Sequence, residues 1–443
     1  MTVKTEHAAR GGKPAARAPG GGRPRAGRGE QPSRADREAR GKDARAAASL
    51  ESQAEFGPDR SRDPVGLLLE QDKSRVPDLV PIRHGRMLVS PFTYFRGAAL
   101  PMAADLATTP ASGLRAQLCG DAHLANFGAF ASPSRQLVFD VNDFDETLPG
   151  PFEWDVKRLA ASLVVAGRNN GFGDKACRKI VLAGVERYRT AMREFAGQPF
   201  LAVWYAHMDV EDVIAHYRSQ LKKKRVKAAD KLVAKAHTHD SMKALRKLTT
   251  QVDGRPQIIS DPPLIEPVEE VFPDEQARAI YEQIRQMLGK YQRTLQSDRK
   301  HLLEQFTLVQ AARKVVGVGS VGTRCWIALM EAGDGTEPLF LQPKEAVASS
   351  LAAYCGRSQY ASHGERVVAG QLLMQAESDI FLGWTHVTGP DGVEHNTFGA
   401  PAGGWTCPIR SQSGTEPWSV LLATPWNGAL RIGSLVRSGS LMV

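Results

Sequence analysis

Long apolar segments are missing from this sequence of 443 residues. A membrane-spanning helix requires about 20 consecutive apolar residues, whereas one of the longest apolar runs, residues 159–167 (LAASLVVAG), has nine. The basic N-terminus is not followed by the apolar segment of a secretory signal peptide. We therefore expect neither a membrane span nor a secretory signal.

Cysteine is scarce and scattered. The five cysteines occur singly, without a C-x-x-C pair: Cys119, Cys177, Cys325, Cys355 and Cys407. An odd, dispersed set is typical of reduced thiols and argues against a disulfide framework or a structural zinc site. Hydrophobic residues make up 42% of the chain and charged residues 24%, so we expect a cytoplasmic protein with one large or two ordinary domains.

The excess of positive charge lies mainly at the N-terminus. The chain carries a net charge of +9, and residues 1–62 contain 14 Lys and Arg against 8 Asp and Glu. This segment is rich in Gly, Pro, Ala and Arg and poor in apolar bulk, which predicts a disordered tail over residues 1–60. Such a tail is either an electrostatic tether to nucleic acid or a solubilising segment; we favour the second.

The rest of the chain predicts an α+β fold. Apolar residues at three- and four-residue spacing predict helices over residues 153–195, and residues 200–250 and 274–305 also have helical patterns. Residues 86–99 mix strand formers with the start of a helix. The pattern then changes: strands with Gly-rich turns are predicted over residues 310–345, a helix over 364–377 and a strand over 380–387.

Two neighbouring acidic motifs carry the first chemical signal. The segment GDAHLANFG (residues 120–128) places Asn126 five residues after Asp121, and a strand then leads into FDVNDFDE (residues 139–146). Phosphoryl transfer uses this arrangement, because one Asp accepts the proton of the acceptor while an Asn and a later Asp hold Mg²⁺ on the nucleotide phosphates. The alternative is that the acidic residues only cap turns.

The site residues follow from this arrangement. Asp121 is the candidate general base, and Asn126 and Asp143 are the candidate magnesium ligands, assisted by Asp145 or Asp140. His123 more plausibly orients this loop by hydrogen bonds than binds a metal. An EF-hand is excluded, because neither Asp140 nor Asp143 begins a loop with ligands at the required positions.

A Gly-rich segment further along the chain gives the second signal. The segment VGVGSVG (residues 316–322) contains a G-x-G-x-x-G pattern, but a strand rather than a helix is predicted after it, which argues against a Rossmann fingerprint. A Gly-rich hairpin, a strand with a Lys and a helix with a Glu are the order of a kinase nucleotide lobe. The candidate nucleotide-binding residues are Gly317, Gly319, Ser320, Gly322, Lys344 and its partner Glu365.

Alternatives to this second assignment remain. The alternative, which we favour less, is a hairpin that has turn glycines and a surface lysine. Pro343 precedes Lys344 and removes a hydrogen-bond donor from the strand. Glu345 or Glu377 could replace Glu365 as the partner of Lys344.

The motifs resemble those of known families. GDAHLANFG, VNDFDE and the following WDVKRLA resemble segments of aminoglycoside and choline kinase-like phosphotransferases. Together with SPFTYFRG and the Gly-rich segment, they look more closely like the DUF2252 proteins, an uncharacterised bacterial family grouped with the protein-kinase-like superfamily. The resemblance covers roughly residues 63–394 and implies a kinase-like two-lobe fold.

The order of the segments suggests that the two lobes are permuted. Residues 63–305 carry the catalytic motifs, and residues 306–395, which resemble a nucleotide lobe, come after them. Residues 396–443 have only four charged residues and no clear periodicity, so we interpret them as an atypical, frameshifted or poorly packed ending.

Three functions therefore remain open. The leading one is a phosphotransferase that uses ATP, or another nucleoside triphosphate, and Mg²⁺, with an unknown hydroxyl-bearing small molecule or protein as acceptor. The second is a metal-dependent phosphohydrolase, which is weakened because His123 is the only histidine in these motifs. The third is a non-catalytic pseudokinase or binding protein.

Overall fold

The computed structural model describes residues 32–57, 61–219, 226–227, 230, 241–333, 337–388 and 394–401. The chain divides into two units, Met1–Asp43 and Ala44–Val443. Of the atypical ending expected over residues 396–443, residues 396–401 belong to a strand and the others lie outside the described residues. None of the described helices is both long and apolar enough to cross a membrane.

Part of the N-terminal segment is helical, which corrects the expectation of disorder up to residue 60. Helix α1 spans Arg34–Ala47, and a 3-10 turn, η1, follows at Ser52–Ala54. The side chains of Ser33 and Asp36 accept hydrogen bonds from each other's backbone N–H groups, which caps the start of α1. Ala and Arg are good helix formers. A segment that is rich in them can therefore form a helix although it has few apolar residues to bury.

Among the described residues of Ala44–Val443, the α-helices α2 (Pro64–Asp72), α3 (Val80–Leu88), α4 (Pro91–Gly97) and α5 (Ala99–Leu106) precede the acidic motifs. The strand formers expected within residues 86–99 are helical. Ser90 decides this, because its hydroxyl accepts the Thr93 N–H while the Thr93 hydroxyl accepts the Ser90 N–H, and Pro91 occupies the first helical position.

Most residues of the acidic motifs lie in loops that connect short strands, and long helices follow these strands in the chain. Two antiparallel pairs are formed, β1 (Arg115–Leu118) with β4 (Leu148–Pro151) and β2 (Phe127–Ala131) with β3 (Leu137–Val141). The predicted helices follow as α6 (Phe152–Asn169) and α7 (Asp174–Ala196), then α8 (Phe200–Trp204), α9 (Val210–Tyr217) and α11 (Ser241–Leu248).

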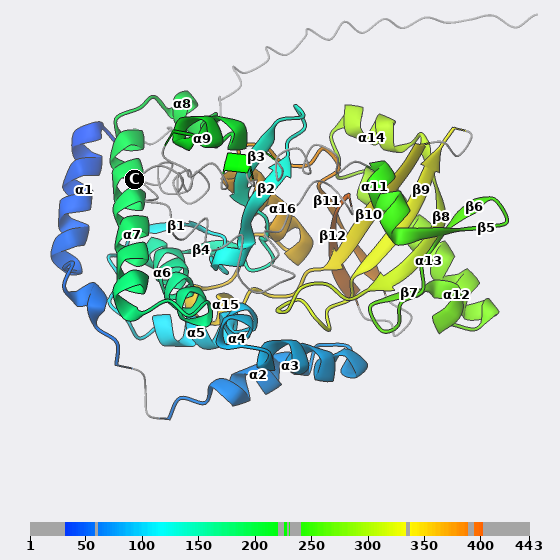
Figure 1. Ribbon diagram of the computed structural model, residues 1–443, viewed down its shortest axis with the longest axis horizontal. Helices are drawn as coiled ribbons and strands as arrows, with labels where there is room; N and C mark the ends of the chain where they lie inside the picture. Colours follow the sequence, from blue (N-terminus) through cyan, green and yellow to red (C-terminus); the bar gives the residue numbers. More distant parts are fainter. Residues whose placement is uncertain are drawn as a thin grey trace, which may run out of the picture. The chain divides into compact units, whose positions relative to one another are not determined.

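A six-stranded antiparallel sheet forms the other part of this unit (Figure 1). Its order is β11-β12-β10-β9-β8-β7. The strands are β7 (Ile265–Pro267), β8 (Phe306–Lys314), β9 (Trp326–Ala332), β10 (Glu337–Glu345), β11 (Gly383–Thr388) and β12 (Glu394–Pro401). A separate hairpin joins β5 (Thr249–Val252) to β6 (Arg255–Ile258).

Helices cover both faces of the sheet, as the alternation along β9 shows. Ile327 and Leu329 pack in one cluster with Leu248 of α11, whereas Ala328 and Met330 pack in another, with α13 (Asp274–Gln292) and α14 (Ser297–Leu303). Successive strand residues point to opposite faces. The sequence assigned residues 63–305 to one mostly helical region. In the structure, α11, α13 and α14 of this region pack on the six-stranded sheet, because apolar residues of β9 and β10 cover their apolar faces.

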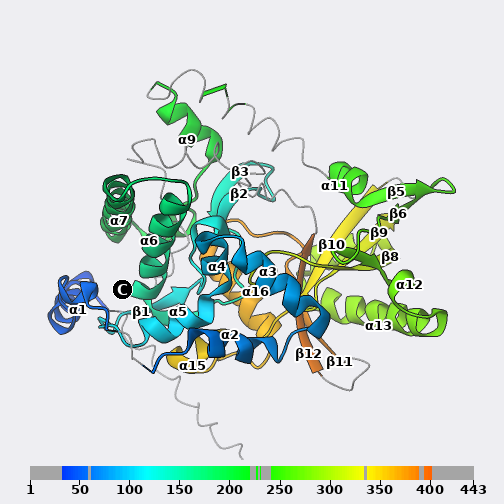
Figure 2. The same ribbon diagram turned by 60° about the horizontal axis from the view of Figure 1, so that its bottom comes forward.

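Helix α16 (His363–Met374) connects the two parts. It lies between α6 and the six-stranded sheet in both views (Figures 1 and 2). Val367, Val368 and Met374 of α16 share one core cluster with Leu159 of α6 and Phe398 of β12. This core holds the sheet against the acidic motifs. Further short helices are α12 (Val268–Val271) and α15 (Ala352–Cys355).

Candidate functional site

The loop that carries Asp121 is fixed by a buried carboxylate. Asp155 in the first turn of α6 is 1% exposed, and its two oxygens accept the N–H groups of Cys119 (2.8 Å) and Gly120 (3.1 Å). Burial raises the pKa of Asp155 to about 6, against the two N–H donors that lower it. The loop is thereby joined to the start of α6.

Gly120 allows this loop to pass close to the second motif. Its φ is +83°, and a Cβ atom at this position would lie 2.3 Å from the carbonyl oxygen of Glu146. Both the backbone conformation and the lack of space therefore require glycine here.

We expect Gly120→Ala to destabilise the fold by about 2–4 kcal/mol, from the cost of a positive φ together with displacement of the Glu146 backbone. Gly171→Ala is the matched control, because Gly171 has φ +76° with no atom within 4 Å of the added Cβ, and it should cost about 1–2 kcal/mol. Urea unfolding measures both. Equal losses in the two variants would show that the contact with Glu146 does not constrain the loop.

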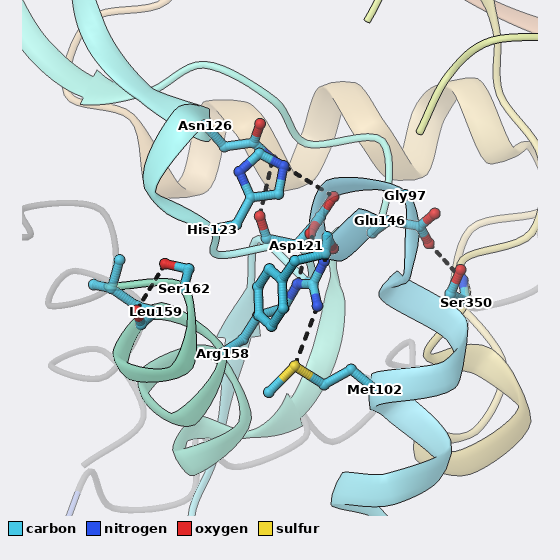
Figure 3. A network of polar contacts seen from close by, with 12 residues as sticks. Gly97, Met102, Asp121, His123, Asn126, Glu146, Arg158, Leu159, Ser162 and Ser350 are labelled. Carbon is cyan, nitrogen blue, oxygen red and sulfur yellow. Dashed lines mark hydrogen bonds and ion pairs between the residues drawn. The ribbon is translucent and has the colours of Figure 1, made fainter. Parts of the chain in front are cut away.

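Asp121 lies beside Arg158 (Figure 3), and its side chain is 16% exposed. Its Oδ1 accepts Arg158 Nε at 2.6 Å, and its Oδ2 is 3.6 Å from His123 Nε2. Arg158 is 3% exposed, and it also donates to the Phe95 carbonyl (3.0 Å) and lies over the Phe95 ring. Burial raises the pKa of Asp121 and outweighs the opposing effect of Arg158.

His123 and Asn126 complete this loop. Burial, reinforced by the positive charges of Arg158 and Arg96, holds the pKa of His123 well below its ordinary value, so the imidazole is neutral near pH 7. Asn126 Nδ2 donates to the Asp121 carbonyl at 2.8 Å. Its backbone carbonyl accepts the Asn142 N–H at 2.8 Å, which joins the two acidic motifs where β2 and β3 meet.

Asp143 and Asp145 lie beside Lys344 of β10. Lys344 Nζ is 3.9 Å from Asp145 Oδ1, and the two side chains are 23% and 27% exposed. Burial raises the pKa of Asp145 to about 7, and the nearby charge of Asp143 adds to this. Burial would also raise the pKa of Asp143, but Lys344 and the Asp145 N–H reverse the direction and lower it. The pair of carboxylates thus shares one ammonium.

The Gly-rich segment reaches the same place. Ser320 Oγ is 3.4 Å from Asp145 Oδ2, although the two residues are 175 positions apart. Asp143 links Lys344 to Asp121 electrostatically. The charge of Lys344 lowers the pKa of Asp143, and the charge of Asp143 raises the pKa of Asp121. The structure therefore brings the Gly-rich segment, Lys344 and both acidic motifs together.

The N-terminal helices hold the Gly-rich segment in place. Arg86 of α3 donates to the Gly317 carbonyl (2.7 Å), Arg75 donates to the Val321 carbonyl, and the Val76 N–H donates to the Gly322 carbonyl (2.8 Å). Gly317 and Gly322 have φ values of +68° and +92°. A Cβ at Gly319 would lie 3.1 Å from the Arg96 carbonyl. The conformation of the Gly-rich loop is therefore fixed by hydrogen bonds to its backbone carbonyls.

The carboxylate that pairs with Lys344 is that of Asp145, and within the described residues no ion pair joins Lys344 to Glu365. Glu365 lies in the first turn of α16, where its N–H donates to Ser362 Oγ. Glu345 pairs with Arg324 (3.1 Å). Glu377 follows α16 and is partly buried.

Asp140 lies in β3, and its Oδ1 accepts the Val141 N–H at 2.8 Å.

Several arginines of the site were not among the residues that the sequence indicated. Arg366 of α16 is 2% exposed and donates to the carbonyls of Asp145, Thr147 and Val347. Arg158 follows Asp155 on α6. The available sequence signal for Arg158 was its spacing of one helical turn from Trp154, which places both residues on the same face of the helix. Nothing in the sequence distinguishes Arg366 or Arg75 from a surface arginine.

Asp143 and Asp145 are the carboxylates that could contribute oxygen ligands to a magnesium ion. Within the described ranges, no group of three or more His, Cys, Asp and Glu side chains is arranged to hold a metal alone. Mg²⁺ commonly binds one or two carboxylates, with water and phosphate oxygens as the other ligands. The charge of Asp143 raises the pKa of Asp145, and a cation between the two carboxylates would relieve this repulsion. Asn142, the residue before Asp143, has a buried Oδ1 with no hydrogen-bond partner.

These features define a mixed helix-and-sheet protein whose site combines partly buried carboxylates, a lysine and a Gly-rich loop that is held by hydrogen bonds. A family model described as "Uncharacterized protein conserved in bacteria (DUF2252)" matches residues 75–397, so the chain belongs to this family. No curated protein and no solved structure matches the chain.

Proposed function

We propose that this chain is an ATP- and Mg²⁺-dependent phosphotransferase of the kinase-like type, acting on a hydroxyl-bearing small molecule or protein. The observation that carries the proposal is the meeting of Ser320 and Lys344 with Asp145 and Asp143, beside Asp121. Turn capping alone gives no reason for a distant lysine and a Gly-rich loop to converge on these carboxylates.

The order of the elements supports the proposal. A Gly-rich connection joins β8 to β9, Lys344 lies on β10, and α16 follows, which is the order of a kinase nucleotide lobe. In this chain the segment with the acidic motifs, between β1 and β4, comes before the Gly-rich connection and Lys344, as in a kinase-like fold with permuted lobes. Asp145 takes the place beside the lysine that the αC glutamate has in protein kinases.

Each site residue then has a role that its surroundings favour. Asp121 accepts the proton of the acceptor hydroxyl, and its raised pKa brings it closer to the operating pH. Neutral His123 and Arg158 position its carboxylate. Lys344 and the loop that contains Gly317, Gly319, Ser320 and Gly322 bind the nucleotide phosphates. Glu365 stays a candidate only if nucleotide binding shifts Lys344.

Magnesium would be held by Asp143, with Asn126 and Asp145 as further ligands. The amide nitrogen of Asn126 is used by the Asp121 carbonyl, so its Oδ1 is the atom left for a ligand. When bound, the ion would neutralise the charge on the phosphates.

A non-catalytic binding protein is the second candidate. The observation that favours it is the ion pair between Arg158 and Asp121, because Arg158 already occupies Asp121 Oδ1 and opposes the rise in the pKa of this carboxyl that burial causes. Turnover separates the two functions, since both predict nucleotide binding.

A thermal-shift experiment tests the nucleotide site directly. We expect ATP with Mg²⁺ to raise the melting temperature of the purified protein, because a ligand that binds only the folded state stabilises it by about 2.7 kcal/mol at 100 times its Kd. Mg²⁺ alone and AMP with Mg²⁺ should give smaller shifts. If no nucleoside triphosphate raises the melting temperature with or without Mg²⁺, both candidate functions fail.

A further inference from the structure

A cavity of about 390 Å³ lies among η1, α4, α5 and α6. This volume falls in the range of about 300–1,000 Å³ that is typical of small-molecule sites. Its walls are mainly apolar, with Phe56, Phe95, Ala98, Pro101, Met102 and Leu106 among the lining residues. An apolar ligand body that left water for these walls would be stabilised by the hydrophobic effect.

The cavity is separate from the carboxylate site. Neither Asp121 nor Arg158 is among its lining residues. Arg158 contacts Phe95 and Met102, which belong to the cavity wall, and its guanidinium then reaches Asp121. A ligand in the cavity would therefore touch residues that hold Arg158 without reaching the candidate base.

Among the described residues that line the cavity, the ammonium group of Lys157 forms no ion pair with a carboxylate. Arg62 and Asp105 are paired with each other (Nη2–Oδ2, 2.8 Å), and Glu55 is exposed to solvent. Lys157 Nζ donates to Thr109 Oγ1 at 3.1 Å, and no ion pair of the described residues includes it.

The surroundings of Lys157 leave its charge only partly compensated. Glu153 acts on this charge one helical turn away, but its Oε1 accepts the Ser112 N–H. Burial lowers the pKa of Lys157 and outweighs the effect of Glu153.

We propose that the cavity binds a small amphipathic carboxylate, with its apolar body against Phe95, Pro101 and Met102 and its carboxylate on Lys157. An anion would supply the charge-assisted hydrogen bond that the Lys157 ammonium lacks. A neutral or cationic ligand of the same length would fill the same walls but leave this ammonium uncompensated. The inference does not depend on the phosphotransferase proposal.

Calorimetric titration of the full chain with decanoate, below the concentration at which it forms micelles, tests the inference. We expect saturable binding of decanoate, weaker binding of decanol and the weakest binding of decyltrimethylammonium. Lys157→Met should weaken decanoate binding by roughly 10- to 100-fold and leave decanol binding unchanged, because only the charged hydrogen bond is lost. Lys175→Met, at an exposed position on α7, is the matched control and should change neither affinity.

A second variant tests the location. Ala161→Phe projects a ring into the cavity from α6 and should abolish the binding of both decanoate and decanol. The inference is overturned if decanoate does not bind, if Lys157→Met binds it as tightly as the original chain, or if the cation binds as well as the anion. The Lys157 comparison remains decisive even if Ala161→Phe does not fold.

Discussion

Asp121→Asn should reduce the formation of ADP from Mg²⁺-ATP by about 10²–10⁴-fold, the usual contribution of a general base, while nucleotide affinity changes little. The asparagine Oδ1 can still accept the Arg158 Nε–H, so the hydrogen-bond geometry is largely kept, but the amide cannot accept the proton of the attacking hydroxyl. ADP formation and calorimetric ATP binding are measured on the same preparations.

Asp174→Asn provides the control for the Asp121 variant, because Asp174 forms an exposed pair with Arg168 far from the motifs in the chain. It should leave both measurements unchanged. Equal ADP formation by Asp121→Asn and the original chain would remove Asp121 from the role of base. If the original chain binds ATP but forms no ADP with any acceptor, the binding-protein candidate is preferred.

Asp143→Asn should lower the Mg²⁺-dependent part of ATP affinity by at least about 100-fold. A direct carboxylate ligand is expected to matter at least as much as outer residues of metal sites, whose loss costs about 10–100-fold. The change also removes a neighbouring negative charge, so the pKa of Asp145 should fall from about 7. The measurements are ATP titrations with and without Mg²⁺.

Asp140→Asn is the comparison for the Asp143 variant, since both aspartates belong to the same motif and Asp140 lies within β3. We expect it to retain most of the Mg²⁺-dependent affinity. If Asp140→Asn loses this affinity and Asp143→Asn keeps it, the assignment of the ligand is reversed. If ATP binds equally well with and without Mg²⁺ in all three proteins, the magnesium assignment fails altogether.

The sequence predicted those helices and strands that are determined by the residue pattern of a short segment. Apolar residues at helical spacing predicted α6, α7 and α16, and the change to strand character predicted β8, β9 and β10. The proximity of Asn126 to Asp121 was also foreseeable, because a five-residue separation within one loop keeps the two residues close. Helix α4 was obscured, since its capping box and Pro91 decide against the strand preference of its aromatic residues.

The sequence by itself therefore determined the α+β class and the two acidic motifs, because spacing and residue type are properties of a short segment. Only the tertiary structure decided that Asp145 lies beside Lys344 and that Arg366, not Glu365, is the residue of α16 turned into the buried loop. Consecutive helical residues point in directions about 100° apart, so their order in the chain does not reveal which one faces the core. That direction is set by packing against Val347, Thr147 and the sheet, which are distant in sequence.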